Sequence, residues 1–178
     1  MLAYASWSMV PHLPAVVTGR EARRDGDGTM SQCSADEEAI RAIIARQFAS
    51  LSWHEGAGPD TTGFAGDFLP GAGLYPAARP ARRIEVADFA ERMRGLSGTT
   101  LRAFQETVLG VELRIFGSIA IAAAGGEMVE NGGETSRSVE MLLLVKSEGA
   151  WKIAAQAWDK ASDANPLPDA LVSDATSR

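Results

Sequence analysis

Cysteine and histidine are scarce in this 178-residue sequence, which has one cysteine, Cys33, and two histidines, His12 and His54. A single cysteine excludes an internal disulfide framework and a cysteine-based zinc site. Two histidines argue against a histidine-rich metal centre. The sequence also has no P-loop, no G-x-S-x-G and no G-x-G-x-x-G followed by a helix. It therefore predicts neither a bound metal nor a cofactor.

The sequence also has no excess of positive charge and no long apolar run. Lysine and arginine number 17 against 23 acidic residues, which gives a net charge of -6. A nucleic-acid-binding protein would need a basic face, and no stretch reaches the roughly 18 apolar residues that span a membrane. With 46% hydrophobic residues the chain has an ordinary globular composition. We expect a single cytoplasmic domain that contacts neither nucleic acid nor membrane.

The two ends of the chain differ from its middle. The first stretch is apolar but broken by Pro11 and Pro14, and a polar, glycine-rich segment follows it. It lacks the basic start of a secretory signal. We predict a flexible N-terminal extension over 1–30, which could come from a misplaced start site, with a weak export signal or targeting arm as the alternative. A single domain over 31–162 and a flexible tail over 163–178 follow.

Two helices are predicted before a run of strands. Ser34 and Glu37 form a capping box, and apolar residues then recur at helical spacing from Ile40 to Leu51, which predicts a helix over about 35–52. A second helix begins near Val86 and ends near Gly95. The glycine- and proline-rich segment between them allows one short edge strand, at Leu74 and Tyr75.

From Leu101 onward the apolar residues alternate, which indicates strands. Four long strands are expected: one that includes Val111 to Ile115, one from Ile119 to about Val129, one from Val139 to Val145 and one from Trp151 to Ala157. The turns between them fall at Gly117–Ser118, at 131–133 and at the three residues 147–149. Two helices followed by a meander predict an α+β domain, with the helices covering one face of a curved antiparallel sheet.

The register of these strands predicts a charged row. If Leu143 faces Ile153 and Ile121 faces Leu143, then Arg137 lies between Glu127 and Asp159 on the helix-covered face. The row is either a structural ion-pair ladder or a polar patch at the mouth of a cavity. In the second case the two carboxylates could act as acid or base and Arg137 could hold an anionic or carbonyl group.

A one-residue bulge would reverse this arrangement. The three charged side chains would then lie on the other face of the sheet, together with Glu140, Gln156 and Trp158.

Other candidates lie nearer the N-terminus. Gln47 falls in the apolar stripe of the first helix, Trp53 and His54 follow that helix, and Tyr75 precedes Pro76. His54 is the one histidine within the predicted domain, so it joins Glu127 and Asp159 as a candidate catalytic residue. Three arginines, Arg79, Arg82 and Arg83, cluster in a loop and form either a solvated turn or a phosphate contact. The candidate ligand-binding residues are Gln47, Trp53, Tyr75, Glu127, Arg137 and Asp159.

The order of elements resembles the NTF2-like (SnoaL-like) superfamily, whose members form a cone of curved sheet capped by helices. The resemblance covers about residues 35–160. It depends on the helix AIRAIIARQFASL at 39–51, the loop and short strand at 67–80, the helix at 84–96, and the strands at 109–125 and 137–160. The superfamily includes ketosteroid isomerase-like, polyketide cyclase-like and scytalone dehydratase-like enzymes as well as non-catalytic domains. The resemblance implies a homodimer formed through the sheet.

The superfamily's catalytic residues have poor matches in this sequence. The isomerases' base position, before a proline in the short strand, corresponds to Tyr75, and the inward position of their protonated acid corresponds to Met141. The histidine–aspartate pair of the dehydratases would have to use His54, at a different place. We therefore expect small-molecule binding in a mixed apolar and polar cavity. The alternatives are a lyase, isomerase or cyclase that uses carboxylates, and a non-catalytic dimeric module that binds a partner.

Overall fold

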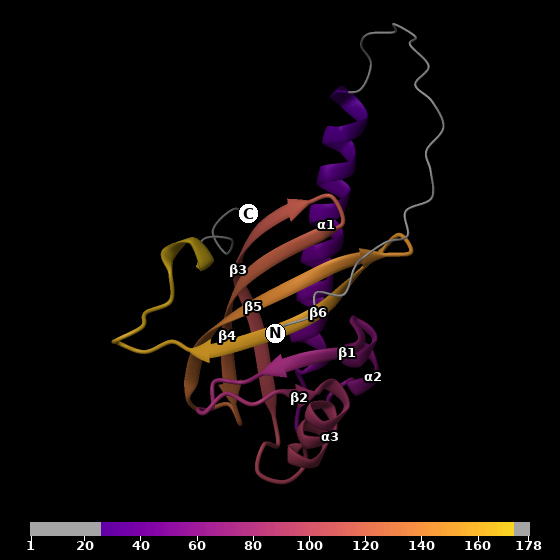
Figure 1. The fold of residues 1–178 in the computed structure, drawn as a ribbon. Helices are drawn as coiled ribbons and strands as arrows, with labels where there is room; N and C mark the ends of the chain where they lie inside the picture. The colour runs from indigo at the N-terminus through magenta and orange to yellow at the C-terminus, as the bar shows by residue number, and fades with distance from the viewer. Residues whose placement is uncertain (1–25, 173–178) are drawn as a thin grey trace, which may run out of the picture.

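The structure, a computed structural model, describes residues 26–172 of the chain, with side chains from Cys33 onward (Figure 1). The expectations for residues 1–25 and 173–178 lie outside the described residues. The elements in chain order are α1 (Gly26–Ser50), α2 (Thr61–Gly66), β1 (Phe68–Tyr75), β2 (Ile84–Glu85), α3 (Val86–Leu96), β3 (Phe104–Phe116), β4 (Ile119–Glu130), β5 (Thr135–Ser147), β6 (Ala150–Lys160) and the short 3-10 helix η1 (Asp169–Leu171). These elements confirm the predicted α+β class.

The strands form one six-stranded sheet in the order β2-β1-β6-β5-β4-β3. The four long strands make the predicted antiparallel meander. Two features differ from the expectation: β1 is eight residues long and runs parallel to β6, and β2 adds a second short strand at the edge. Pro70 is accommodated because it lies where the pairing of β1 with β6 is irregular, between Phe68 and Gly73.

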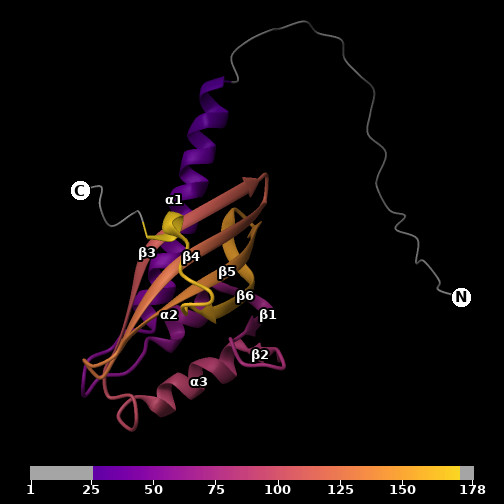
Figure 2. The same cartoon turned by 90° about the vertical axis from the view of Figure 1, so that its left-hand side faces the viewer.

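The helices cover one face of this sheet, here called the inner face (Figure 2). α1 begins at Gly26, before the predicted start and inside the segment assigned to the extension, and it projects past the strands in both views. Ile40, Ile44 and Phe48 of α1 are buried in a core that also contains Leu144 and Ile153. No helix among the described residues is long and apolar enough to cross a membrane.

The hairpin between β5 and β6 departs from the predicted register. Its loop has two residues, Glu148 and Gly149, both with positive φ, and Ser147 pairs with Ala150. This geometry matches the right-handed twist of the flanking strands better than the predicted three-residue loop. Lys146, and not Val145, therefore lies opposite Trp151.

A bulge on β6 then changes which residues share a face. The pairing shifts between Leu144–Ile153 and Leu143–Ala155, so that Ala154 is the extra residue. Trp151 and Ile153 consequently lie on the inner face, whereas Ala155 and Ala157 lie on the outer face.

The inner face of the central strands is filled by alanines on β4 and leucines on β5. Ala120, Ala122 and Ala124 of β4 are buried, as are Leu142 and Leu144 of β5. The larger apolar residues predicted to face the helices lie outward instead; they are Ile119, Ile121, Met141 and Leu143, all more than 40% exposed. The prediction of the inward face was therefore wrong for β4 and β5, because the larger side chains of each alternating row were assigned to the core.

Residues 163–172, assigned from the sequence to the tail, end in η1 beside the outer face of the sheet. Leu171 is 2% exposed there. A Cβ at Gly110 or Gly125 would lie only 2.7 or 2.4 Å from the backbone of Leu171. The two glycines thus provide the space in which η1 rests on β3 and β4.

Candidate functional site

A cavity of about 700 Å³ opens between the inner face of the sheet, α3 and the loop that joins β1 to β2. Its apolar wall comes from α2 and α3 through Phe64, Phe89, Met93 and Leu96, and from the sheet through Phe104, Met128 and Trp158. Phe89 and Trp158 meet edge to face, with ring centroids 5.4 Å apart. A volume of this size accommodates a small organic molecule.

Glu140 and Gln156 supply the polar part of the cavity floor. They lie on neighbouring strands, and Gln156 Nε2 donates a hydrogen bond to Glu140 Oε2. Burial raises the pKa of Glu140 to about 7, although the hydrogen bond from Gln156 acts in the opposite direction. Among the described residues nothing donates to the buried Gln156 Oε1. Because buried polar atoms are usually paired, this oxygen has an unused capacity to accept a hydrogen bond.

Glu106 adds a second carboxyl to the same cavity from β3. Burial raises its pKa well above the ordinary range, and the nearby Glu140 carboxyl raises it further. Two interacting carboxyls of this kind share protons as a pair. The floor can therefore both donate and accept a hydrogen bond near neutral pH.

Four arginines line the more exposed parts of the cavity, here called the rim: Arg79, Arg82, Arg83 and Arg92. The first three belong to the cluster singled out in the sequence, and Arg92 comes from α3. No group of three or more histidine, cysteine, aspartate or glutamate side chains that could hold a metal ion occurs among the described residues.

Gln47, Trp53 and His54 do not line the cavity. Gln47 Nε2 donates to the Phe64 carbonyl at 3.0 Å and to Asp67 Oδ2 at 3.2 Å, which connects α1 to the segment before β1. Trp53 Nε1 donates to the Leu101 carbonyl at 3.1 Å, and the ring is buried. His54 is exposed.

The predicted charged row is present only in part. Glu127 lies opposite Arg137 as expected, and Arg137 Nε donates to Glu127 Oε2 at 3.0 Å. Asp159 lies opposite Val139, and its carboxylate forms an ion pair with Arg79 at 3.1 Å. The three-residue row was therefore wrong, because the two-residue turn and the bulge shift β6. The surviving Glu127–Arg137 pair lies on the outer face.

Glu106 and Glu140 were not among the site residues predicted from the sequence. The sequence analysis placed Glu140 and Gln156 on the face away from the helices, whereas the structure buries both on the inner face. The inward acid position assigned to Met141 was also wrong: Met141 is 56% exposed, and its neighbour Glu140 lies on the inner face. The sequence did contain a signal for Glu140, because this acidic residue lies between apolar residues within a predicted strand. Glu106 had no such signal.

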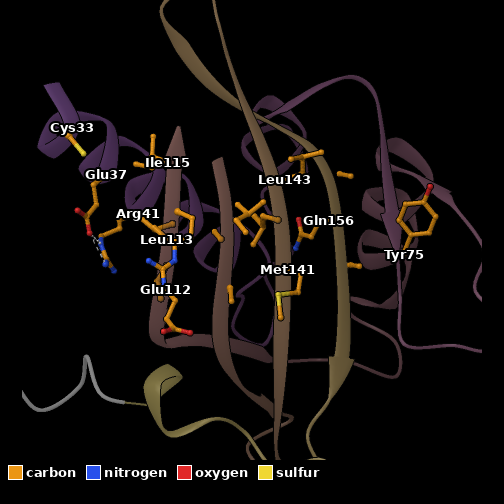
Figure 3. A pocket seen from close by; sticks show the side chains of 18 residues that line it. Cys33, Glu37, Arg41, Tyr75, Glu112, Leu113, Ile115, Met141, Leu143 and Gln156 are labelled. Carbon is orange, nitrogen blue, oxygen red and sulfur yellow. Dashed lines mark hydrogen bonds and ion pairs between the residues drawn. The ribbon is translucent and has the colours of Figure 1, made fainter. Parts of the chain in front are cut away.

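Tyr75, the remaining candidate, lies on the outer face at the end of β1 (Figure 3). It borders a second, more open hollow of about 830 Å³ together with Met141 and Leu143 of β5. Figure 3 shows Cys33, Glu37 and Arg41 of α1 on the opposite side of that hollow from Tyr75. The outer face is thus more apolar than a solvated sheet face usually is.

Comparison with known proteins supports the fold but gives no activity. No family model matches the sequence, and no curated protein matches it. A protein of unknown function from Mycobacterium tuberculosis is 16% identical with a TM-score of 0.64, over 84% of this chain and 86% of that chain. An NTF2-like protein with a cystatin-like fold from Novosphingobium aromaticivorans is 14% identical with a TM-score of 0.64, over 78% and 91%.

A candidate scytalone dehydratase from Novosphingobium aromaticivorans is also similar in structure. It is 11% identical with a TM-score of 0.62, over 84% of this chain and 99% of that chain. Further NTF2-like proteins of unknown function, among them one from Pseudomonas putida, have the same architecture. At such low identity these similarities concern the fold. The chain has the NTF2-like fold, an α+β cone with helices packed on one face of a mixed sheet.

Proposed function

We propose that this protein binds a small, largely apolar molecule in the inner cavity, with one polar group of that molecule held by Glu140 and Gln156. The observation that carries the proposal is the unpaired Gln156 Oε1 beside a buried carboxyl on the floor of a cavity of about 700 Å³. A protonated Glu140 would donate to a carbonyl oxygen, and Gln156 Oε1 would accept from a hydroxyl. The surrounding aromatic and aliphatic side chains would desolvate the rest of the ligand.

The test uses 2-acetylnaphthalene, a neutral aromatic ketone, titrated into the wild-type protein by calorimetry at several pH values. Its affinity should increase as the pH falls through about 7, because Glu140 then carries the proton that it donates to the ketone. The Glu140→Gln variant keeps a neutral donor at this position, so its affinity should vary less with pH than that of wild type. Glu112→Gln, an exposed outer-face change, is the matched control. Saturable binding that is unaffected by Glu140→Leu would contradict the proposal.

Acid–base catalysis in the same cavity is a second candidate function. It is favoured by the interaction of two carboxyls with raised pKa values, because one can be protonated while the other is ionised. The ionised member would take a proton from the carbon beside a ketone while the protonated member donates to the oxygen, giving an enol. Exchange of the methyl protons of 2-acetylnaphthalene in heavy water, followed by NMR, tests this. If wild type exchanged these protons no faster than the Glu106→Gln variant, the result would contradict catalysis by the two carboxyls.

We also propose that two copies associate through the outer face of the sheet. Support comes from the contiguous apolar side chains Ile121, Met141 and Leu143, which a single copy leaves exposed. A two-fold dimer buries such a patch against itself.

A further inference from the structure

Two of the four rim arginines are engaged within the protein. Arg79 Nη2 contacts Asp159 Oδ2 at 3.1 Å, and its Nη1 donates to the carbonyls of Pro76 and Ala78. Arg83 pairs with Glu85, and its Nη2 donates to the Gly71 carbonyl at 2.7 Å. These contacts tie the β1–β2 loop to β1, β2 and β6. Arg79 and Arg83 therefore serve to hold the loop in place.

The side chains of the other two, Arg82 and Arg92, have no hydrogen bond or ion pair with any residue that the structure describes, although both residues line the cavity. Arg92 follows Phe89 by three positions and precedes Leu96 by four, so it shares the cavity-facing side of α3 with these two apolar residues. Arg82 lies in the loop on the same rim. Two unpaired guanidinium groups beside an apolar cavity favour an anionic partner.

The floor of the cavity, unlike the rim, disfavours an anionic group. Glu140 is buried there and Glu106 is half-buried, and no cationic side chain hydrogen-bonds to either one among the described residues. Their raised pKa values show that this place disfavours negative charge. A ligand with an anionic group would therefore place that group at the rim and a neutral group at the floor.

Resting on the proposed function, we infer that the ligand is an amphipathic organic carboxylate. Arg82 and Arg92 bind its carboxylate at the rim, the apolar wall contacts its body, and Glu140 with Gln156 binds a hydroxyl or carbonyl at its far end. Guanidinium groups suit a carboxylate because they donate two parallel hydrogen bonds to it.

The test compares a carboxylate probe with its uncharged methyl ester. 6-Hydroxy-2-naphthoate has a carboxylate and a hydroxyl at opposite ends of an apolar body, and its methyl ester lacks the charge. Their affinities are measured by calorimetry on the full chain, for wild type, for the double variant Arg82→Gln with Arg92→Gln, and for Arg94→Gln. Arg94 is the matched control because it lies on α3, pairs with Glu91 and does not line the cavity.

Wild type should bind the carboxylate about tenfold more tightly than the ester, and added salt should reduce that difference. The double variant should lose about tenfold in affinity for the carboxylate and none for the ester. Arg94→Gln should match wild type. Equal affinities of wild type for the two probes would overturn the carboxylate inference alone, because the cavity would still bind the neutral body. Binding of neither probe would overturn the cavity proposal as well.

Discussion

At the scale of single residues, the most informative side chain is Glu140, because its proton is coupled to the stability of the fold. Its folded-state pKa of about 7 lies above the ordinary 4.5, so the folded protein holds this proton more tightly than the unfolded chain does. The stabilisation is fully present below about pH 4.5 and is lost as the pH rises through about 7. Glu106 acts in the same direction.

Replacement of Glu140 by Gln removes this dependence while keeping the shape of the protonated acid. We expect similar stability for the variant and wild type at low pH. At pH values above about 7 the variant should be more stable by about 3 kcal/mol. Urea unfolding across the pH range measures the difference, with Glu112→Gln as the exposed control. If the free energy of unfolding varied with pH in the same way for wild type and Glu140→Gln, Glu140 could not be a buried carboxyl with a raised pKa.

At the scale of elements, the bulge at Ala154 and the two-residue turn at Glu148–Gly149 decide which residues form the site. Apolar periodicity predicted the strands, the Gly117–Ser118 turn and the pairing of Glu127 with Arg137, and the structure confirms all three. It could not reveal the bulge, because small residues such as Ala154 and Ala155 fit either face. A shift of one residue exchanges the two faces of a strand, so Gln156 on β6 was missed. Glu140 on β5 was missed because the larger side chains of that strand were assigned to the core.

The contact of η1 with β3 and β4 gives a prediction at this scale. A Cβ at Gly125 would lie 2.4 Å from the Leu171 carbonyl oxygen, which is backbone and cannot rotate away. Gly125→Ala should therefore displace η1 and destabilise the fold by about 1–3 kcal/mol. Gly133→Ala is the control, since its Cβ would meet only one atom, at an ordinary 3.4 Å. Thermal unfolding compares the two, and a Gly125→Ala variant as stable as Gly133→Ala would show that η1 does not rest on this glycine.

At the scale of the whole molecule, the two faces of the sheet have separate properties. The inner face holds the cavity with its two carboxyls, and the outer face exposes a contiguous apolar surface. The sequence predicted the architecture because apolar rows and turn residues determine it, and similarity to other NTF2-like structures is confined to that level. The ligand is not determined at that level, since it depends on a few side chains within one cavity.

Dimerisation through the outer face is testable by mass in solution. Wild type should have twice the 18.8 kDa mass of the chain, and Leu143→Arg should be a monomer, because it places a charge in the centre of the apolar patch. Ala87→Arg, an exposed change on α3, should remain a dimer. Light scattering after gel filtration gives these masses. A monomeric wild type would contradict the proposed association.

The most direct test of the central claim is a crystal structure of the complex with 2-acetylnaphthalene below pH 7. The ketone should lie in the inner cavity against Phe89 and Trp158, with its oxygen within hydrogen-bonding distance of the Glu140 carboxyl. A ketone found only on the outer face, beside Met141 and Leu143, would contradict the claim that the inner cavity is the binding site.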